Sequence, residues 1–228
     1  MSPFVMHLAP AAPTGVEFEA VVKTTTGLVS TIEVDLPPDL NGKLAIVLLR
    51  SGRSPSFFNE PTGWTKVIES SNTARMALYA RVCDGSEGGT LTILQTDDLG
   101  DPQTGRISAM AWRVSGVATG EATYLVAEQD TVTNDPPDLT LPWGSSIESV
   151  VLAAYSSRRS DWSVNSYPTN YTELDTVFNG SENDLAYTGI AVGERTLSAA
   201  SENPGAFTIT APNGVSAERV FTIGLRAA

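Results

Sequence analysis

The heptapeptide Pro61-Thr62-Gly63-Trp64-Thr65-Lys66-Val67 returns as Pro168-Thr169-Asn170-Tyr171-Thr172-Glu173-Leu174, an offset of 168 − 61 = 107 residues. Gly63 and Asn170 occupy the same place in the two copies. Glycine and asparagine are the residues that most readily adopt a positive φ. Each copy is therefore predicted to make one turn before an aromatic residue that enters a strand.

Shorter echoes flank the heptapeptide at nearly the same distance. The pairs at an offset of 105 are Leu36-Pro37 with Leu141-Pro142, Ala45-Ile46-Val47 with Val150-Val151-Leu152, and Ser51-Gly52-Arg53 with Ser156-Ser157-Arg158; Thr90-Leu91-Thr92 matches Thr196-Leu197-Ser198 at 106. Short loop insertions produce such drift, and a period this long is not that of a solenoid. We predict a duplicated β unit, residues 16–130 and 131–228, whose halves share one core.

Apolar residues alternate with polar or small ones along most of the chain. The alternating sets are Ile32, Val34 and Leu36; Met76, Leu78, Ala80 and Val82; Met110, Trp112 and Val114; Phe207 and Ile209; and Phe221, Ile223 and Leu225. Alternation predicts strands with one face in a core and one toward water. The continuous apolar runs Leu44–Leu49 and Val150–Ala154 predict central strands covered on both faces.

The predicted fold class is all-β, an antiparallel Greek-key or jelly-roll sandwich with internal pseudo-duplication. No segment keeps a helical period over three turns, and turn signals such as Asn41-Gly42 and Asp84-Gly85 separate the strands. The long excursions after the central strands suit a Greek key better than a meander. The turn-rich stretch Thr131–Pro137 is short, so one domain over residues 16–228 is preferred to two.

Residues 1–15 are predicted to form an arm outside the sandwich, because three prolines interrupt any regular structure there. Its apolar residues include Phe4, Val5, Met6 and Leu8. One interpretation is a frayed terminus. The other is an arm that docks on a neighbouring subunit, and the sequence leaves both open.

Composition excludes several classes of partner and compartment. The charge is 14 − 26 = −12, which disfavours binding to a phosphate backbone, so no nucleic-acid partner is expected. The apolar run Leu44–Leu49 is too short to span a membrane, and the first residues do not form a signal peptide. Cys83 is the only cysteine, so no internal disulfide is possible, and a buried inert thiol is predicted.

No residue pattern predicts catalysis, a metal or a cofactor. The only histidine, His7, lies in the arm, which disfavours Ser-His-Asp and Cys-His devices. The acidic stretch Asp97–Asp101 offers oxygens to an ion, but it matches no EF-hand and reads more simply as a solvated loop. Glu173 and Asp175 form a conceivable hydrolytic pair, which the first copy of the repeat does not share.

Aromatic and arginine residues concentrate in the loop after each central strand, residues 50–59 and 155–167. Such residues on a rigid sandwich are typical interface anchors. They equally suit stacking on a sugar, and a third interpretation is that the rings only cap the open end of the sandwich. Together with the arm, the candidate interface residues are Phe4, Met6, Leu8, Arg53, Phe57, Phe58, Arg158, Arg159, Trp162 and Tyr167.

The chain resembles a group of tailed-bacteriophage virion proteins. The likeness is carried by a central strand at Leu44–Leu49, the segment Pro61–Thr65, and Leu78–Val82 before Asp84-Gly85, with a second copy at Pro168–Thr172. The resemblance implies an all-β head-decoration, head-fibre or tail-surface protein. It implies a virion location after assembly in the host cytoplasm, and it supplies no catalytic residues.

The function expected from these features is that of a non-enzymatic virion structural protein, which decorates or cements the capsid exterior. Its expected partners are other virion proteins, either the major capsid protein or a tail component, and further copies of itself, with a trimer favoured. The alternative is a tail-fibre or spike module that binds host-surface glycans. A glycan-processing enzyme that uses Glu173 and Asp175 is the weakest expectation.

Overall fold

The computed structural model of the chain describes residues 15–52, 57–70, 75–119, 125–130, 134–158, 162–179, 188–211, 214 and 218–228. Every regular element in these ranges is a β-strand, and all named strand pairs are antiparallel. The predicted all-β, antiparallel fold class is confirmed. Within these ranges there is no helix long and apolar enough to cross a membrane.

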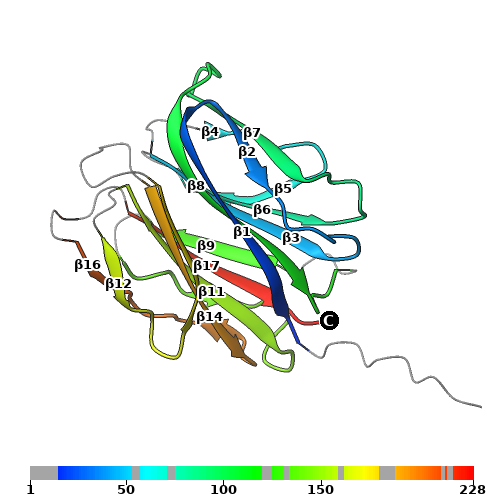
Figure 1. The fold of residues 1–228 in the computed structure, drawn as a ribbon. Helices are drawn as coiled ribbons and strands as arrows, with labels where there is room; N and C mark the ends of the chain where they lie inside the picture. Colours follow the sequence, from blue (N-terminus) through cyan, green and yellow to red (C-terminus); the bar gives the residue numbers. More distant parts are fainter. Residues whose placement is uncertain are drawn as a thin grey trace, which may run out of the picture.

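Two five-stranded sheets form the centre of the molecule (Figure 1). The first half contributes β1 (Glu17–Val29), β2 (Thr31–Asp35), β3 (Leu44–Ser51), β4 (Phe57–Phe58), β5 (Thr65–Glu69), β6 (Met76–Val82), β7 (Thr90–Thr96) and β8 (Gly105–Ser115). The second half contributes β9 (Leu125–Asp130), β10 (Leu139–Thr140), β11 (Ser149–Ser157), β12 (Ser163–Ser166), β13 (Thr172–Asn179), β14 (Thr188–Leu197), β15 (Ser201–Glu202), β16 (Thr208–Thr210) and β17 (Arg219–Arg226). The large sheets have the orders β1-β8-β3-β6-β5 and β13-β14-β11-β17-β9.

The sheets stack as layers with three apolar clusters between them. The central cluster joins the two large sheets and includes Ile46 and Trp112 from the first half and Leu152 and Ile223 from the second. An outer cluster lies between the first large sheet and the small sheet β2-β7-β4. Another outer cluster lies between the second large sheet and the strand pairs β10-β15 and β12-β16. The arrangement is consistent with two β-sandwiches that pack face to face.

The central position of β3 and β11 confirms the interpretation of the two apolar runs. Every residue of β3 and every residue of β11 is buried. β3 lies between β8 and β6, and β11 lies between β14 and β17. Each strand therefore has a hydrogen-bonded neighbour on both sides and an apolar layer on both faces, as a continuous apolar run predicts.

Three of the strands predicted to have a solvent face are buried on both faces over most of their length. In β6, β8 and β17 the small residues between the alternating apolar positions are buried, among them Ala77, Ala109 and Ala111, whereas Arg81 and Arg113 are half-buried. These small residues face the outer layers, whereas their larger neighbours face the central one. Val82, predicted to face a core, is 39 % exposed. The prediction of one buried and one solvent-exposed face is confirmed for β2. It also holds for residues 207–210, where Thr208 and Thr210 are exposed. Cys83 is buried, as predicted.

The two turns predicted from the heptapeptide are confirmed. Gly63 has a φ of 79° and Asn170 a φ of 68°. In each copy the backbone N–H of the following aromatic residue donates to the proline carbonyl at 3.0 Å, from Trp64 to Pro61 and from Tyr171 to Pro168. The two rings are buried in the outer clusters of their respective halves, so they occupy related places.

Cross-strand registers relate the two large sheets residue by residue. The row Thr65–Ala80–Ile46–Trp112–Val21 crosses the first sheet, and the row Thr172–Glu194–Leu152–Ile223–Ala127 crosses the second. When the strands are numbered from the start of each half, both rows cross the same strands in the same order: the fifth, the sixth, the third, the last and the first. Both fifth strands carry a register shift at the same place in the heptapeptide, between Lys66 and Ile68 and between Glu173 and Asp175. These correspondences favour the interpretation that the chain contains a duplicated unit. The Greek-key or jelly-roll topology likewise stays an interpretation.

Two of the shorter echoes do not correspond in space. The registers equate Ile46 with Leu152, an offset of 152 − 46 = 106, rather than 105. An error of one residue matters because it moves a side chain to the opposite face of the sheet. Thr90 begins β7 in a small sheet, whereas Thr196 lies near the end of β14 in a large one, so that match is wrong.

The aromatic residues of the two heptapeptides should each be essential for stability. Trp64→Ala and Tyr171→Ala are each expected to lower the free energy of unfolding by about 3–5 kcal/mol, because each removes a buried ring and leaves a cavity. Val82→Ala, at an exposed position of β6, is the control and should cost about 0.5 kcal/mol or less. Urea denaturation measures all three. A loss below about 1 kcal/mol at either aromatic residue would contradict its placement in a core.

One carboxylate on the central face of β14 should make stability depend on pH. Glu194 follows Ile190 and Val192 on that face, and burial raises the pKa of its carboxyl group. The folded protein therefore holds the proton more tightly than the unfolded chain, so the carboxyl contributes stability at low pH that is lost as the pH rises through the folded-state pKa. Glu194→Gln should raise the denaturation midpoint at pH 7 and change it less at pH 4. Glu33→Gln, at an exposed position of β2, controls for the change in net charge; an equal gain from both variants would refute the assignment.

Candidate interaction surface

The C-terminal ends of the central strands β3 and β11 lie on the same side of the molecule, which we call the loop end. Ser108 at the start of β8 lies beside the end of β3, because it pairs with Arg50. Thr188 at the start of β14 lies next to Gly189, which pairs with Ser157 at the end of β11. The hydroxyls of Ser108 and Thr188 are 2.6 Å apart. The structure therefore brings together the two loop regions that the sequence singled out in separate halves.

A buried amide seals the two halves to each other at the loop end. Asn179, the last residue of β13, donates from Nδ2 to the carbonyl oxygens of Thr26 in β1 at 2.5 Å and Ile107 in β8 at 2.7 Å. Lys23 in β1 also forms an ion pair with Asp175 in β13. Because an unpaired amide would be costly at this depth, these bonds fix how β13 meets the first half.

Four arginines gather inside the loop end; this arginine cluster consists of Arg50, Arg75, Arg158 and Arg219. The Arg50 side chain is fully buried. Burial first, and then the charges of Arg219 and Arg158, lower the pKa of Arg50 well below its ordinary value. Burial and the charge of Arg75 lower the pKa of Arg219 as well. The cluster also has a carboxylate beside it, since Glu69 lies 3.5 Å from Arg75.

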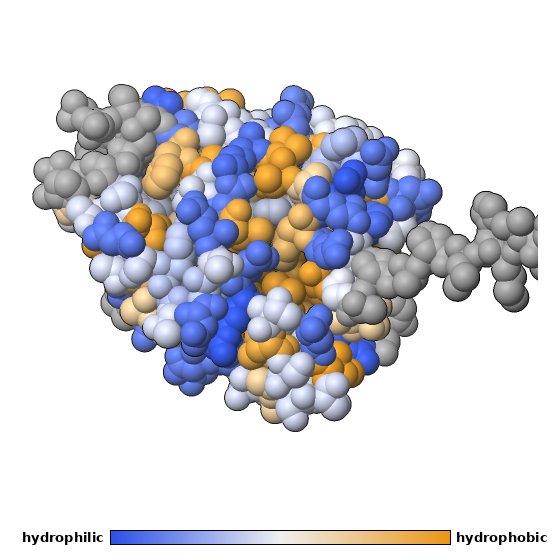
Figure 2. Space-filling model, turned by 60° about the horizontal axis from the view of Figure 1, so that its bottom comes forward, coloured by the Kyte–Doolittle hydropathy of each residue, from blue (hydrophilic) through white to orange (hydrophobic). Residues whose placement is uncertain are grey.

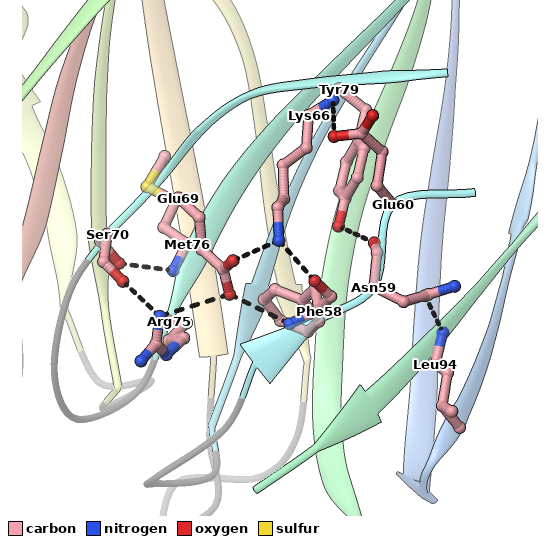
Figure 3. A network of polar contacts seen from close by, with 10 residues as sticks. All are labelled: Phe58, Asn59, Glu60, Lys66, Glu69, Ser70, Arg75, Met76, Tyr79 and Leu94. Atoms are coloured by element: carbon pink, nitrogen blue, oxygen red, sulfur yellow. Dashed lines mark hydrogen bonds and ion pairs between the residues drawn. The ribbon is translucent and has the colours of Figure 1, made fainter. Parts of the chain in front are cut away.

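A network of polar contacts fastens β4 onto β5 and β6 beside this cluster (Figure 3). The Glu69 carboxylate accepts a hydrogen bond from the Phe58 backbone N–H at 3.0 Å and from Lys66 Nζ at 2.7 Å, and it lies 3.5 Å from Arg75 Nη1. Lys66 Nζ also donates to the Phe58 carbonyl at 2.6 Å. The Arg75 guanidinium stacks on the Phe57 ring, 3.5 Å from its centroid.

The chemistry of this network is structural. Tyr79 donates its hydroxyl to the Asn59 carbonyl at 2.8 Å, and the Asn59 side chain accepts from the Leu94 N–H at 2.6 Å. Burial, and then the charges of Glu69 and Glu60, raise the pKa of Tyr79. A phenol held in its neutral form and committed as a donor serves to position the chain rather than to exchange protons.

The structure removes two residues from the candidate interface. Phe58 is 2 % exposed and Trp162 is 3 % exposed, and each belongs to an outer apolar cluster. Their rings cap the ends of the outer layers, which is one of the interpretations that the sequence left open. Phe57, Arg158 and Tyr167 are half-buried. Phe4, Met6, Leu8, Arg53 and Arg159 lie outside the described residues.

An exposed aromatic side chain beside Trp162 was missed in the sequence. Phe178 in β13 is 42 % exposed, and its ring centroid lies 4.8 Å from that of Trp162 in an edge-to-face arrangement. Both rings lie over Gly189, where an added Cβ would come within 2.6 Å of the Phe178 ring and 2.8 Å of the Trp162 ring. Gly189 is the one feature of the local sequence that could have indicated this contact. It does so only once β14 is known to pair with β13, because that pairing places Phe178 beside the glycine.

Two further apolar side chains are exposed at the loop end. Leu99, at the tip of the β7–β8 hairpin, is 83 % exposed, and Leu28, at the end of β1, is 63 % exposed. Val29 pairs with Gly105 at the base of that hairpin, which places both leucines at the same end. Together with Phe178 they are called the apolar tips. They are the three most exposed of the large hydrophobic residues in the described ranges.

Outside the loop end, the surface of the protein is more mixed. On the face drawn in Figure 2, apolar residues occur in small groups separated by polar ones. Monomeric proteins rarely expose large continuous apolar areas, so small groups of this kind need no partner. The apolar tips differ because all three lie at the loop end and are the most exposed large hydrophobic side chains of the described residues.

The acidic residues that the sequence singled out make local contacts in the described part of the chain. Asp97 accepts from the N–H groups of Leu99 and Asp101 at 2.9 Å, and from Gln103 Nε2 at 3.0 Å, so its carboxylate holds its own turn. Glu173 accepts from the Thr176 hydroxyl at 3.2 Å, and the register shift separates it from Asp175. In the part of the chain that the structure describes, no three His, Cys, Asp or Glu residues are grouped so as to hold a metal ion.

Comparisons with protein-family models, with curated proteins and with solved structures found no match to this chain. The function of this chain is therefore inferred from its residues and their geometry.

The contact between the two rings and Gly189 gives a direct test of the loop-end structure. Gly189→Ala should lower the free energy of unfolding by about 1–3 kcal/mol, because the methyl group displaces the buried Trp162. The tryptophan fluorescence of the folded protein should also change, because the surroundings of Trp162 change. Gly27→Ala is the matched control, since an added Cβ there meets nothing within 4 Å. If both variants unfold at the same denaturant concentration, Trp162 and Phe178 do not pack on this glycine.

Proposed function

We propose that the protein is a non-enzymatic structural protein of a tailed-phage virion, which decorates or cements the capsid exterior through protein–protein contacts made at its loop end. The observation that carries the proposal is the meeting of both central-strand ends at one end of the molecule, where Leu28, Leu99 and Phe178 are exposed. The virion location itself derives from the resemblance of the sequence.

The apolar tips supply the kind of contact that protein interfaces use. A few anchor side chains, most often tryptophan, tyrosine and arginine, account for most of the binding energy at an interface, and the surrounding contacts, to which apolar side chains such as leucine contribute, exclude water. Half-buried Phe57 and Arg75, stacked on each other, add an aromatic and an arginine beside them. A standard interface buries about 1,600 Å² in total, which one end of a small protein can supply when several copies gather on a particle.

The second candidate function is that of a fibre or spike module that binds a glycan. The observation that favours it is the exposed ring of Phe178 near β12, where Ser163, Asn165 and Ser166 are exposed. β12 pairs with β16, which exposes Thr208 and Thr210. An aromatic ring beside hydroxyl and amide groups suits a neutral sugar.

Acidic substitutions at the apolar tips should weaken attachment to the particle. Leu28→Asp, Leu99→Asp and Phe178→Asp are each expected to reduce the affinity for purified virions by about tenfold or more, because a charge would be buried at the contact. Co-sedimentation with virions that lack the protein measures this affinity. Val82→Asp makes the same change at an exposed position of β6 away from the loop end and should bind as the parent does.

The same variants distinguish the two candidate functions. Mass spectrometry of purified virions first establishes whether the protein is on the particle. Glycan binding lost in Phe178→Ala and unchanged in Leu99→Asp, with particle association intact in both, would replace the assembly proposal with the glycan-binding one. Absence of the protein from purified virions would refute both locations on the particle.

A further inference from the structure

A groove of about 480 Å³ opens at the end of the molecule opposite the loop end. One wall is formed by residues 36–41, between β2 and β3, and the other by residues 85–89, between β6 and β7. Its size is within the range of sites that hold a small molecule or a few side chains. No part of the proposed loop-end contact involves it.

The two walls are fastened to the body of the protein before anything binds. The Leu36 N–H donates to the Gly89 carbonyl at 2.9 Å and joins one wall to the other. The Gly42 N–H donates to the Cys83 carbonyl at 2.9 Å, and Arg113 Nη1 donates to the Pro38 carbonyl at 2.5 Å. A groove that is already ordered loses little entropy when it is occupied, which favours binding.

The lining is apolar with acidic positions. Leu36, Pro37, Pro38 and Leu40 supply the apolar part, and Asp39 and Glu87 are its ionisable residues. The Asp39 side chain is 91 % exposed and lies 3.7 Å from Arg113 Nη1, and Glu87 lies 3.2 Å from Arg81 Nε. Such a lining favours an apolar segment that carries no negative charge.

Residues 4–8 have this composition. Phe4, Val5, Met6 and Leu8 are apolar, and residues 1–14 contain no aspartate or glutamate. The described part of the chain begins at Gly15, which contacts Gly116 just after β8. Gly15 is therefore at the same end of the sheet as the groove.

The distance between Gly15 and the groove suits a contact within one chain. The row Phe18–Val114–Leu44–Val82 crosses β1, β8, β3 and β6 at this end of the sheet. Three strand spacings of about 4.8 Å separate β1 from β6 by about 14 Å across the sheet. Gly15 precedes Phe18 in β1 and residues 85–89 follow Val82 in β6, so both lie beyond the same end of this row. Residues 9–14 include two prolines and, when extended, reach about 19 Å at about 3.1 Å per residue. A linker whose length matches the span raises the local concentration of its end to the millimolar range.

We propose that residues 4–8 bind in the groove formed by residues 36–41 and 85–89 of the same chain. The sequence left two interpretations of the arm open, a frayed terminus and a segment that docks on a neighbour, and the short span favours this third one. The contact needs no other virion protein, so it goes beyond the proposed function and is tested separately from it.

Disulfide trapping in the full-length chain tests this contact. In Met6→Cys/Pro38→Cys, mild oxidation with diamide at pH 8 should form an intrachain disulfide at least fivefold faster than in Met6→Cys/Asp98→Cys, where the second cysteine is at the loop end. Cys83 does not compete, because it is 3 % exposed and burial raises the pKa of its thiol to about 12. Peptide mapping by mass spectrometry identifies the bond, and non-reducing electrophoresis separates monomers from dimers.

A variant that fills the groove provides the matched control. A Cβ added at Gly89 meets nothing within 4 Å, so Gly89→Phe can place its ring in the groove without displacing the backbone. Added to Met6→Cys/Pro38→Cys, it should slow the intrachain disulfide to the rate of the Asp98 control. Equal rates in the groove pair and the loop-end pair would overturn the proposal. Dimers in place of intrachain bonds would also overturn it, in favour of an arm that docks on a neighbour.

Discussion

The structure depends on two strands that have no face toward water. All residues of β3 and β11 are buried. A single two-layer sandwich can cover only one face of a sheet, so each large sheet requires a second layer on its other side. The small sheets cover the outer faces, and the two large sheets cover each other's inner faces. Removal of this apolar surface from water is the main favourable contribution to holding the halves together.

The contact between the halves is reciprocal. β1 of the first half lies against β13, the fifth strand of the second, and β5 lies against β9, the first strand of the second half. A pair of related units that use the same surfaces on each other is the arrangement of a two-fold dimer. The hypothesis of a duplicated unit, a pair of this kind fused in one chain, would explain why the central cluster draws on the same strands of both halves.

Much of this fold could be predicted because the decisive signals are local. The apolar runs identify β3 and β11, and Gly63 and Asn170 identify the turns before β5 and β13. The second buried face of β6, β8 and β17 could not be predicted, because alanine and glycine do not stand out from polar residues in an alternating pattern. Their burial depends on layers contributed by residues far away in the sequence.

The loop end was only partly predictable for a similar reason. The sequence identified the arginine-rich and aromatic loops in each half, but their meeting depends on the direction in which the large sheets stack. Phe58 and Trp162 looked like surface anchors because large aromatic rings in loops usually are. Phe178 carries the exposed ring instead, since Trp162 and Gly189 hold it at the side of β13.

The edges of the large sheets support the proposal that association uses the ends of this molecule. Register shifts interrupt three of the four edge strands, β1, β5 and β13, and Lys23 lies within the longest of them. Bulges and charged side chains on edge strands prevent pairing with strands of other proteins. A chain that blocks sideways growth of its sheets leaves its ends as the surfaces for specific contacts, and these are the places where the apolar tips and the groove lie.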